Sequence, residues 1–382
     1  MPSSSSPRGS RRHLPPLLAT AFLFIRRRLP VLLMPASLFF LATGASASPP
    51  GARIPRGYVC RRITGGIRID GLLDEKAWRT APWTEDFVDI EGAIRPRPRF
   101  RTRAKMLWDS DYLYIGAELE EPQVWGTLTK RDTVIFYDDD FEVFMDPNGD
   151  NVEYYEMEMN ALNTVWDLFL DRPYRDGGRA NNSWDIDGIR TAVHVRGTIN
   201  AYADRDTGWT VEIAMPWKAL GQYAHRPAPP NIGDQWRINF SRVEWALDTT
   251  GGRCAKIQGR KEDNWVWSPQ GVVDMHQPEM WGYLQFGGRN ASPMEFRPDP
   301  SRPAEEVLMA IYHAQMAFRA AHGRWAASLG ELQIAQTGGE VFATPPAVSL
   351  TSAGYIASVT IRVRGGKSLT WYVTQDSRLW HD

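Results

Sequence analysis

The middle of this chain is a succession of short segments in which apolar and polar side chains alternate with a period of two. Two of them, Asp140–Asp146 and Tyr154–Asn160, flank the sequence 146–151, which is rich in Asp, Asn, Gly and Pro. This period is typical of half-buried β-strands, and such turn residues connect neighbouring antiparallel strands. Because the pattern repeats with almost no helical periodicity, it predicts a mainly β fold, an antiparallel β-sandwich of the immunoglobulin or jelly-roll type.

Further strands and one short helix complete this prediction. The expected strands are 104–108 and 113–119, joined by a turn at 109–111, followed by 209–214, 236–240 and 281–286. The helix is expected at 216–220, where Pro216 stands in the first turn, a position that suits proline.

The C-terminal part of the chain has a different pattern. Apolar residues recur at helical spacing from Val307 to Ala321, and Gly323 follows them as a stop. Two alternating segments then flank Gly365 and Gly366, a pair that is typical of a two-residue hairpin turn. We therefore expect a small α+β module built from one helix and one hairpin.

The N-terminus has the features of a secretory signal. Arg26, Arg27 and Arg28 precede an apolar run at 29–42, and small residues at 44–47 follow it. The run is shorter than the ~20 residues that span a bilayer, which favours a cleaved signal peptide over a retained anchor. We expect a protein that is secreted or held in the periplasm or cell envelope.

These patterns divide the chain into five stretches, with boundaries where Pro, Gly and Ser cluster. They are a signal peptide at 1–47, a linker at 48–57, a β-sandwich at 58–288, a second linker at 289–303 and the helix-plus-hairpin module at 304–382.

Composition narrows the partners and cofactors. The net charge is -1, which gives no electrostatic reason to expect nucleic acid as a partner. The 16 Trp residues either pack the core or offer ring faces to the apolar side of a sugar. Cys60 and Cys254 either form a disulfide or stay free, and they make no metal or redox motif. No organic cofactor is expected.

The two central strands place their polar residues on the face opposite the apolar one. If they pair through the turn between them, Glu142, Glu156 and Glu158 gather on one sheet face with Asn160. One interpretation is a solvated surface, since antiparallel sheets often leave one face wet. Another is a site whose carboxylates accept hydrogen bonds from sugar hydroxyls, and a third is the acid pair of a glycosidase.

Oxygen-rich side chains cluster near the same turn. Asp146, Asn148 and Asp150 lie in it, and three consecutive aspartates occupy 138–140. Calcium prefers oxygen ligands of this kind, although the spacing is not that of an EF-hand, and acidic turns are common without metal. Structural calcium at Asp146, Asn148 and Asp150 is therefore one expectation, and a metal-free turn is the other.

A second aromatic cluster lies at 264–282, which its Pro and Gly content predicts to be a loop. Loops of sandwiches often carry binding sites. Trp265 and Trp267 are candidates for stacking on a sugar. His276 is a candidate ligand contact, with a packed histidine as the alternative.

Several short motifs follow one another in order along the sandwich segment. They are Ile69–Trp78, 107–109 with 112–114, Asp140–Asp146, 154–156, 208–213 with 216–218, 236–240 and 281–284. In this order and spacing, the stretch from Ile69 to Phe286 resembles the family 9 carbohydrate-binding modules, which are part of the wider group of DOMON-type β-sandwiches.

The resemblance implies roles for individual residues. Two aromatic rings would hold a terminal sugar between them, the first at Phe136 with Tyr137 beside it. A strand glutamate, which corresponds to Glu142, would bind the hydroxyl groups of that sugar.

The second ring would fall near Met275 and His276, where this sequence has no Trp, and the neighbouring Trp265 or Trp267 could substitute. The family also has structural calcium sites and is often attached to xylanases and related glycoside hydrolases. The implied partners are therefore polysaccharide or oligosaccharide, calcium, and secreted glycoside hydrolases.

The C-terminal module loosely resembles the globular part of type II secretion or pilin-like proteins, in 311–318, 322–325 and 376–380. Such a module would contact envelope proteins, and a small packing module is the plainer interpretation.

Together, these observations predict an exported, non-catalytic protein that recognises polysaccharide or oligosaccharide and is linked to carbohydrate catabolism. Three alternatives remain open. They are a glycoside hydrolase that hydrolyses O-glycosyl bonds, a haem or redox module that uses Met275 and His276, and an envelope assembly protein that acts through the C-terminal module.

Overall fold

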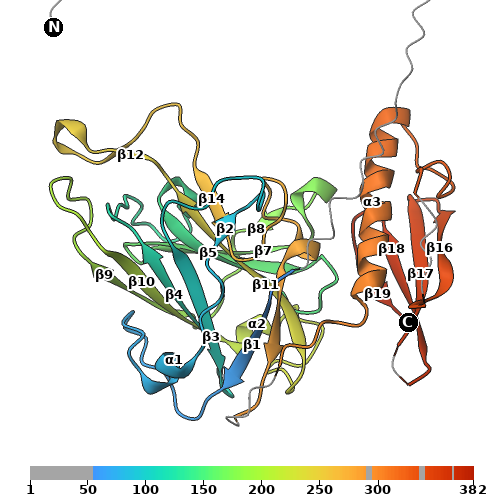
Figure 1. The fold of residues 1–382 in the computed structure, drawn as a ribbon, viewed down its shortest axis with the longest axis horizontal. Coiled ribbons are helices and arrows are strands. Elements are labelled where there is room, and N and C mark those ends of the chain that lie inside the picture. The colour runs from blue at the N-terminus through green and yellow to red at the C-terminus, as the bar shows by residue number, and fades with distance from the viewer. Residues whose placement is uncertain (1–54, 290–294, 335–339, 364) are drawn as a thin grey trace, which may run out of the picture. The chain divides into compact units, whose positions relative to one another are not determined.

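The computed structural model describes residues 55–289, 295–334, 340–363 and 365–382. The predicted signal peptide at 1–47 lies outside the described residues, as do parts of both predicted linkers. The prediction of a mainly β fold is confirmed: the described residues form one large sheet, a two-stranded sheet and a separate four-stranded sheet (Figure 1).

The large sheet curls back on itself to form the two layers of a sandwich (Figure 1). In order of pairing its strands are β8 (Ala180–Asn181), β7 (Val165–Leu170), β6 (Tyr154–Asn160), β5 (Asp140–Asp146), β11 (Gln235–Glu244), β15 (Gly282–Phe286), β1 (Gly57–Arg62), β3 (Thr102–Trp108), β4 (Tyr112–Glu120), β10 (Gly208–Pro216) and β9 (Arg190–Arg196). Beside this path, β14 (Asp263–Val266) pairs with β11 and with β2 (Val88–Asp89). Strands β8 to β15 of the path make one layer, and β3 to β9 make the other.

Strand β1 joins the two layers. Its residues 57–60 pair in parallel with 283–286 of β15, and Arg61 and Arg62 pair in parallel with β3. The sheet is therefore mixed, whereas the sequence predicted antiparallel pairing throughout. The difference arises because alternation within a strand reports which face is buried, and it carries no information about the direction of a distant partner.

The apolar sides of the sandwich strands meet in one core between the layers. On β5 and β6 the core residues are the predicted ones: Phe141, Val143, Met145, Tyr155, Met157 and Met159. The other layer contributes Leu113, Ile115, Ala117 and Leu119 of β4. Because burying one large apolar side chain contributes about 1.5–3 kcal/mol, this core fixes which face of each strand turns inward.

The hairpin between β5 and β6 sets the register of the candidate site. The Asp146 carboxylate accepts hydrogen bonds from the N–H groups of Gly149 (2.8 Å) and Asn151 (2.9 Å). These two residues have φ angles of 73° and 69°, a conformation that Gly and Asn adopt most readily. With the turn closed in this way, Glu142 lies opposite Glu158.

The remaining elements of the sandwich are short. They are α1 (Lys76–Thr80), η1 (Ile135–Tyr137), η2 (Tyr174–Asp176), α2 (Trp217–Leu220), η3 (Thr250–Gly252), η4 (Pro278–Met280) and the strand pair β12 (Leu247–Asp248) and β13 (Ala255–Lys256). Helix α2 confirms the helix expected after Pro216. Strand β14 occupies the start of 264–282, so the prediction of a loop was wrong there.

A helix and four strands form the C-terminal module. Helix α3 (Arg302–His322) packs on a sheet with the strand order β16 (Phe342–Leu350), β17 (Tyr355–Arg362), β18 (Ser368–Thr374) and β19 (Leu379–His381). Gly323 ends the helix at a φ of 71°, as predicted. The predicted hairpin is β17 and β18, whereas β16 and β19 were not expected, because β16 is too irregular and β19 too short to show a clear alternation.

Polar contacts connect the module to the sandwich. Arg237 of β11 donates to Glu305 of α3 at 2.6 Å, and both side chains are buried. The Tyr312 hydroxyl of α3 donates to Asp176 at 2.5 Å, and Asp176 also accepts from the Ser377 hydroxyl at 2.7 Å. These contacts join the module directly to the sandwich.

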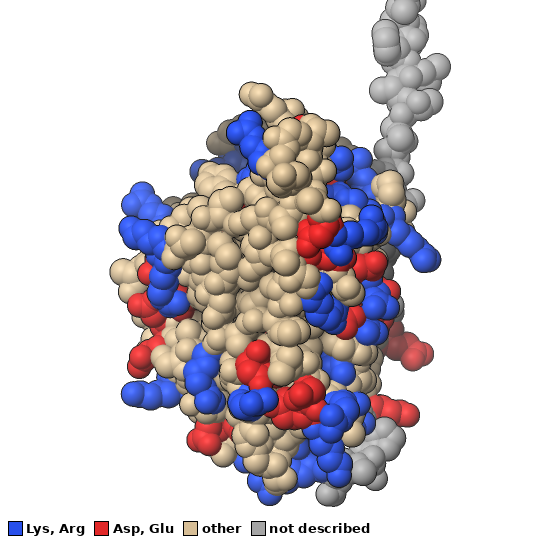
Figure 2. All heavy atoms as spheres, turned by 90° about the vertical axis from the view of Figure 1, so that its left-hand side faces the viewer, with Lys and Arg blue, Asp and Glu red and all other residues tan. Residues whose placement is uncertain are grey.

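On the surface, side chains of both signs are interspersed around a largely uncharged centre of the face drawn in Figure 2, which agrees with the small net charge. Within the described ranges, no helix combines the length and the apolar character needed to cross a bilayer. Cys60 is buried, Cys254 is half-buried, and both thiols are free.

Candidate functional site

The acidic residues of β5 and β6 lie on the sheet face that points away from the core. They are Asp140 and Glu142 on β5 and Glu156 and Glu158 on β6, and this set is called the acidic face below. All four residues are buried, with at most 5% of each exposed. Other segments therefore cover the acidic face, and its interpretation as a solvated surface is wrong.

Two segments contact the β6 glutamates from outside the sheet. The N–H groups of Ile135 and Phe136 in η1 donate to Glu158 Oε2 at 3.0 and 2.9 Å. Farther along the strand, Nε2 of His276 lies 4.0 Å from Glu156 Oε2. The acidic face thus lies under η1 at one end and under the loop before η4 at the other.

Burial raises the pKa of each carboxyl group of the acidic face, and repulsion from Glu142 raises it further in Asp140, Glu156 and Glu158. Burial raises the pKa of Glu142 to about 7, and burial together with the charge of Glu142 raises the pKa of Glu156 to about 8. The same two causes raise the pKa of Asp140 and of Glu158 well above their usual range. The acidic face therefore holds bound protons near neutral pH unless a cation replaces them.

Aromatic rings border the acidic face in two places. In η1 the rings of Phe136 and Tyr137 lie 4.7 Å apart, and 54% of Tyr137 is exposed. Tyr174 of η2, of which 46% is exposed, packs edge-on against His276 at 4.5 Å. Burial, followed by the charges of the two β6 glutamates, raises the pKa of Tyr174 to about 12. These four residues are called the aromatic rim.

His276 is a packed, neutral histidine. Its Nδ1 atom shares a hydrogen bond of 2.9 Å with the Tyr154 hydroxyl, and its ring packs edge-on against Phe144. Burial lowers the pKa of the imidazole to about 4. The adjacent Met275 is buried in an apolar cluster with Phe144 and Tyr154.

Trp265 and Trp267 do not fit their predicted role as sugar platforms. Trp265 of β14 is buried, with the guanidinium groups of Arg99 and Arg242 5.1 and 5.2 Å from its ring centre. Trp267 is wholly buried in the sandwich core, and its indole N–H donates to Glu85 at 3.2 Å. Both rings are core residues because the strand alternation turns them inward.

Asn160 is also engaged within the chain. Its amide group donates to Leu128 O at 2.8 Å and to Asp138 Oδ2 at 2.9 Å. Its Oδ1 atom accepts the N–H groups of Leu162 and Thr164 at 3.1 and 3.0 Å. These bonds use the hydrogen-bonding capacity of the side chain, so Asn160 holds the turn after β6 and is not open to a ligand.

The turn residues predicted to bind calcium have other partners. Both oxygens of Asp146 accept N–H groups of the turn, as described above. Asp150 accepts the N–H of Val152 at 3.2 Å and lies 3.6 Å from Arg378. Asn148 Oδ1 is buried without a partner. Calcium at this turn stays a prediction.

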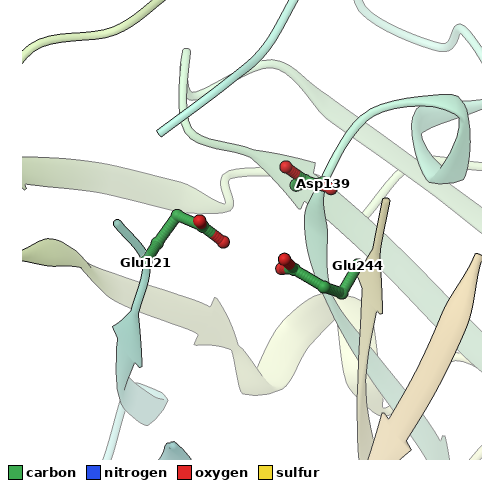
Figure 3. A group of neighbouring side chains, drawn as sticks. All are labelled: Glu121, Asp139 and Glu244. Atoms are coloured by element: carbon green, nitrogen blue, oxygen red, sulfur yellow. The ribbon is translucent and has the colours of Figure 1, made fainter. Parts of the chain in front are cut away.

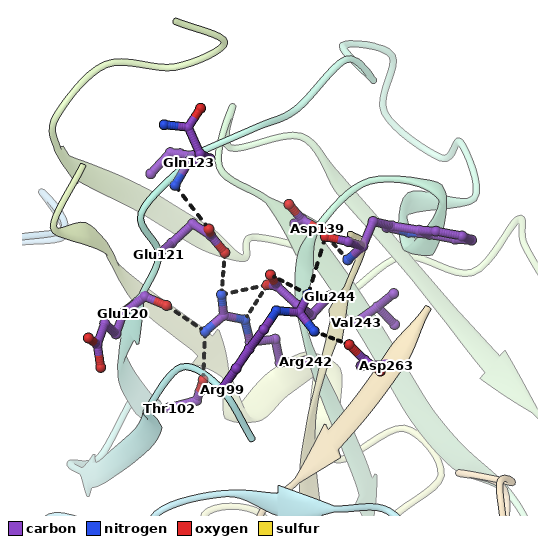
Figure 4. A network of polar contacts seen from close by, with 12 residues as sticks. Arg99, Thr102, Glu120, Glu121, Gln123, Asp139, Arg242, Val243, Glu244 and Asp263 are labelled. Atoms are coloured by element: carbon purple, nitrogen blue, oxygen red, sulfur yellow. Dashed lines mark hydrogen bonds and ion pairs between the residues drawn. The ribbon is translucent and has the colours of Figure 1, made fainter. Parts of the chain in front are cut away.

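A second acidic group lies beside the acidic face. Glu121, Asp139 and Glu244 come from different segments and point toward one another (Figure 3). The guanidinium group of Arg242 lies among them, and its Nη2 atom donates to Glu121 at 2.5 Å and to Glu244 at 2.6 Å (Figure 4). This group therefore contains its own cation.

A third acidic group, formed by Asp132, Asp167 and Asp185, also contains an arginine. Arg131 contacts Asp167, lies 3.0 Å from Asp185 and lies 3.6 Å from Asp132. In the part of the chain that the structure describes, the acidic face is thus the one group of close carboxylates without an arginine or lysine partner.

Residues 69–268, just over half of the chain, match the family model described as "Carbohydrate family 9 binding domain-like". The chain belongs to this family. The match begins before α1 and ends after β14, so it contains the acidic face and most of the aromatic rim. The resemblance inferred from the sequence motifs is confirmed.

Curated relatives match the family 9 domain alone. Exoglucanase XynX of Acetivibrio thermocellus is 28% identical over 162 residues, which are 42% of this chain and 12% of that protein. Endo-1,4-beta-xylanase A of Thermoanaerobacterium saccharolyticum is 28% identical over 164 residues, with the same coverage of 42% and 12%. The matched part of the chain spans about an eighth of the length of these relatives.

Solved structures show weaker similarity. A family 9 module from Caldicellulosiruptor kristjanssonii in complex with cellotriose has a TM-score of 0.41 and 18% identity, covering 64% of this chain and 100% of that one. A putative carbohydrate-binding protein from Bacteroides uniformis has a TM-score of 0.46 and 15% identity, covering 60% and 99%.

Two residues of the family 9 domain that border the site were not predicted. Asp140 has the same strand parity as Glu142, so the alternation could have included it in the acidic face. Tyr174 lies in η2, outside the strands, and no pattern in the sequence connects it to His276.

Proposed function

We infer that the family 9 domain binds a polysaccharide or oligosaccharide at the acidic face and aromatic rim, without hydrolysing it. The observation that carries this inference is that two half-exposed tyrosine rings, Tyr137 and Tyr174, border the segments that contact the β6 glutamates. Tyr137 follows the two η1 residues whose N–H groups donate to Glu158, and Tyr174 packs against His276, which lies 4.0 Å from Glu156. The family to which the chain belongs supports the ligand class.

The aromatic rim and the acidic face both have side chains whose chemistry suits a sugar. The face of an aromatic ring packs against the C–H side of a pyranose. Carboxyl oxygens accept hydrogen bonds from hydroxyl groups, and a hydrogen bond between neutral groups contributes about 0.5–1.5 kcal/mol. A sugar ring stacked on Tyr174 would bring its hydroxyls toward Glu156, the glutamate nearest to His276.

Binding without hydrolysis follows from where the carboxyl groups lie. Glycosidases place their two acids on either side of the scissile bond. Glu142 and Glu158 instead lie side by side on one sheet and are buried. We therefore favour binding over the glycoside hydrolase alternative.

The cellular role that we propose is attachment to polysaccharide outside the cytoplasm, in carbohydrate catabolism. The relatives whose family 9 domains match are named as an exoglucanase and xylanases, so secreted glycoside hydrolases are the proposed partners. Fractionation of the source cells, with the protein found in the medium or envelope, tests the location.

The binding test uses the full chain and calorimetry with xylan, β-glucan, xylo-oligosaccharides and cello-oligosaccharides. Tyr137→Ala and Tyr174→Ala are each expected to weaken the affinity at least tenfold. Tyr202→Ala is the matched control, because 48% of Tyr202 is exposed and it is not part of the rim. Absence of binding to every ligand, or equal affinities of all three variants, would refute the proposal.

A further inference from the structure

The three acidic groups found among the described residues differ in whether they contain an arginine. Arg242 lies within the group of Glu121, Asp139 and Glu244, and Arg131 contacts all three aspartates of the third group. The acidic face contains as many carboxyl groups in close proximity and is at least as deeply buried. Among its described contacts, however, no arginine or lysine is present.

A buried carboxylate needs compensation for the water that it has lost. An arginine, a proton or a metal ion can supply it. His276 does not, since its Nε2 atom lies 4.0 Å from Glu156 Oε2 and its Nδ1 atom is hydrogen-bonded to Tyr154. The acidic face is therefore left with bound protons or with a cation from solution.

Buried carboxyl oxygens without a hydrogen-bond partner favour a cation from solution over bound protons. Oδ2 of Asp140 is buried and has no hydrogen-bond partner, whereas Oδ1 accepts the N–H of Val243 at 2.9 Å. Oε2 of Glu156, a neighbour outside the closest trio, is likewise buried without a partner. Buried polar atoms in native proteins are nearly always satisfied, so these two oxygens indicate a missing partner on the same sheet face.

The spacing of the trio suits a single ion. Asp140, Glu142 and Glu158 each offer one oxygen, and these atoms lie within 4.8 Å of one another. Oxygen ligands lie about 2.3–2.6 Å from Ca²⁺, so two on opposite sides of the ion are about 4.6–5.2 Å apart. An all-oxygen, mainly carboxylate set is typical of a hard cation and not of zinc or copper.

We propose that Asp140, Glu142 and Glu158 bind one divalent cation, with Ca²⁺ as the preferred ion and Glu156 as a further oxygen ligand. The site differs from the turn of Asp146, Asn148 and Asp150. It does not depend on sugar binding, because the ligands and the argument come from the buried charges alone.

The test is calorimetric titration of the full chain with CaCl₂ at pH 7, after EDTA treatment and dialysis. One ion per chain is expected, with release of protons, since the carboxyl groups must ionise to bind it. Proton release is measured by repeating the titration in two buffers of different ionisation enthalpy. MgCl₂, which prefers shorter metal–oxygen distances, is expected to bind at least tenfold more weakly.

Variants assign the site. Asp140→Asn keeps an oxygen to accept the Val243 N–H and removes the charge, and Glu142→Gln removes a carboxylate that makes no described hydrogen bond to the backbone. Each is expected to weaken Ca²⁺ binding at least tenfold. Asp206→Asn is the matched control, because Asp206 is a buried aspartate that accepts N–H groups of Val124 and Thr198 outside the acidic groups; its affinity should not change.

Circular dichroism shows whether Asp140→Asn and Glu142→Gln fold. If one of them does not fold, the Ca²⁺ affinity of the other tests the site. No saturable Ca²⁺ binding by the unmodified chain would overturn the proposal, and so would unchanged binding in both folded variants. Loss of binding in Asp150→Asn alone would assign the ion to the turn and overturn it as well. Ca²⁺ binding without any saccharide affinity would support the cation site while refuting the proposed function.

Discussion

Glu142 of β5 and Glu158 of β6 lie directly opposite each other across a hairpin, and both side chains are buried. Like charges at directly opposite positions destabilise a sheet, and burial adds the loss of hydration to their repulsion. The strand register that places them there is fixed by the core on the other face of the same strands. The acidic face is therefore destabilised by repulsion and lost hydration whenever its carboxyl groups ionise.

The first prediction concerns the stability effect of Glu142 in the presence of a chelator. Its pKa is about 7 in the folded protein, above the ordinary value of an unfolded chain. The stability that this group contributes is fully present below pH ~4.5 and is lost as the pH rises to about 7. Glu142→Gln, which cannot ionise, should be more stable than the unmodified protein at pH 8, by on the order of 1–3 kcal/mol.

Urea unfolding with EDTA at pH 4.5 and pH 8 measures this difference, which should nearly vanish at the lower pH. Glu120→Gln is the control, since Glu120 is exposed, and it should change the free energy of unfolding by less than ~0.5 kcal/mol at either pH. A Glu142→Gln variant that is less stable at pH 8 would contradict the expectation.

The second prediction concerns Glu279, which contacts both Arg175 (2.9 Å) and His313 of α3 (3.4 Å). Burial would raise the pKa of Glu279, but the charge of Arg175 and the contact with His313 outweigh it and lower the pKa to about 2. A group whose pKa falls on folding contributes stability above its unfolded pKa. This contribution, on the order of 2–3 kcal/mol, should therefore be lost as the pH falls from about 4.5 to about 2.

The measurement compares Glu279→Gln with the unmodified protein across this pH range. The variant should be clearly less stable at pH 7, and the gap should narrow as the pH approaches 2. Glu306→Gln in α3 is the control, because 45% of the Glu306 side chain is exposed and ion pairs of solvent-exposed carboxylates contribute about 0–1 kcal/mol. A gap that is constant with pH would show that charge is not the cause.

The position of the acidic face could be predicted from the sequence, because it depends on local information. Alternation in β5 and β6 fixes which residues share a face, and the turn at 146–151 fixes which of them are opposite. Glu142, Glu156 and Glu158 therefore meet where the pattern places them. The burial of that face was not predictable, since η1 and the loop of His276 reach it from distant parts of the chain.

The difference between local and long-range information also explains the predictions that the structure contradicts. Trp265 and Trp267 lie next to Pro269 and Gly271, and those residues predict a loop. The structure instead pairs β14 with β11 and β2, a long-range contact that turns both rings into the core. The parallel pairing of β1 and the position of Tyr174 also depend on contacts between residues far apart in the sequence.

The third prediction concerns the acidic group that contains an arginine. Arg242 is wholly buried and donates to Glu121, Glu244 and Thr102. Arg242→Leu would leave buried carboxylates without a cation, and breaking a buried pair from one side costs about 3–5 kcal/mol. Arg131→Leu is the matched control, since 43% of the Arg131 side chain is exposed and two of its three aspartate partners, Asp132 and Asp185, are exposed to water. Denaturant unfolding should give the larger loss for Arg242→Leu; equal losses would mean that burial does not set the cost.

The last prediction tests the packing of Trp267 without altering the tryptophan. A Cβ atom added at Gly282 of β15 would lie 2.4 Å from the Trp267 ring and 2.9 Å from the Arg56 carbonyl oxygen. The indole is wholly buried and cannot swing aside, so Gly282→Ala should overpack the core and destabilise the protein by about 1–3 kcal/mol. Gly66→Ala is the control, because its added methyl group would meet only the Tyr114 hydroxyl, at 3.9 Å. Thermal unfolding of both variants decides the matter: a Gly282→Ala protein as stable as Gly66→Ala would mean that Trp267 moves freely, and its ring would again be a candidate for ligand stacking.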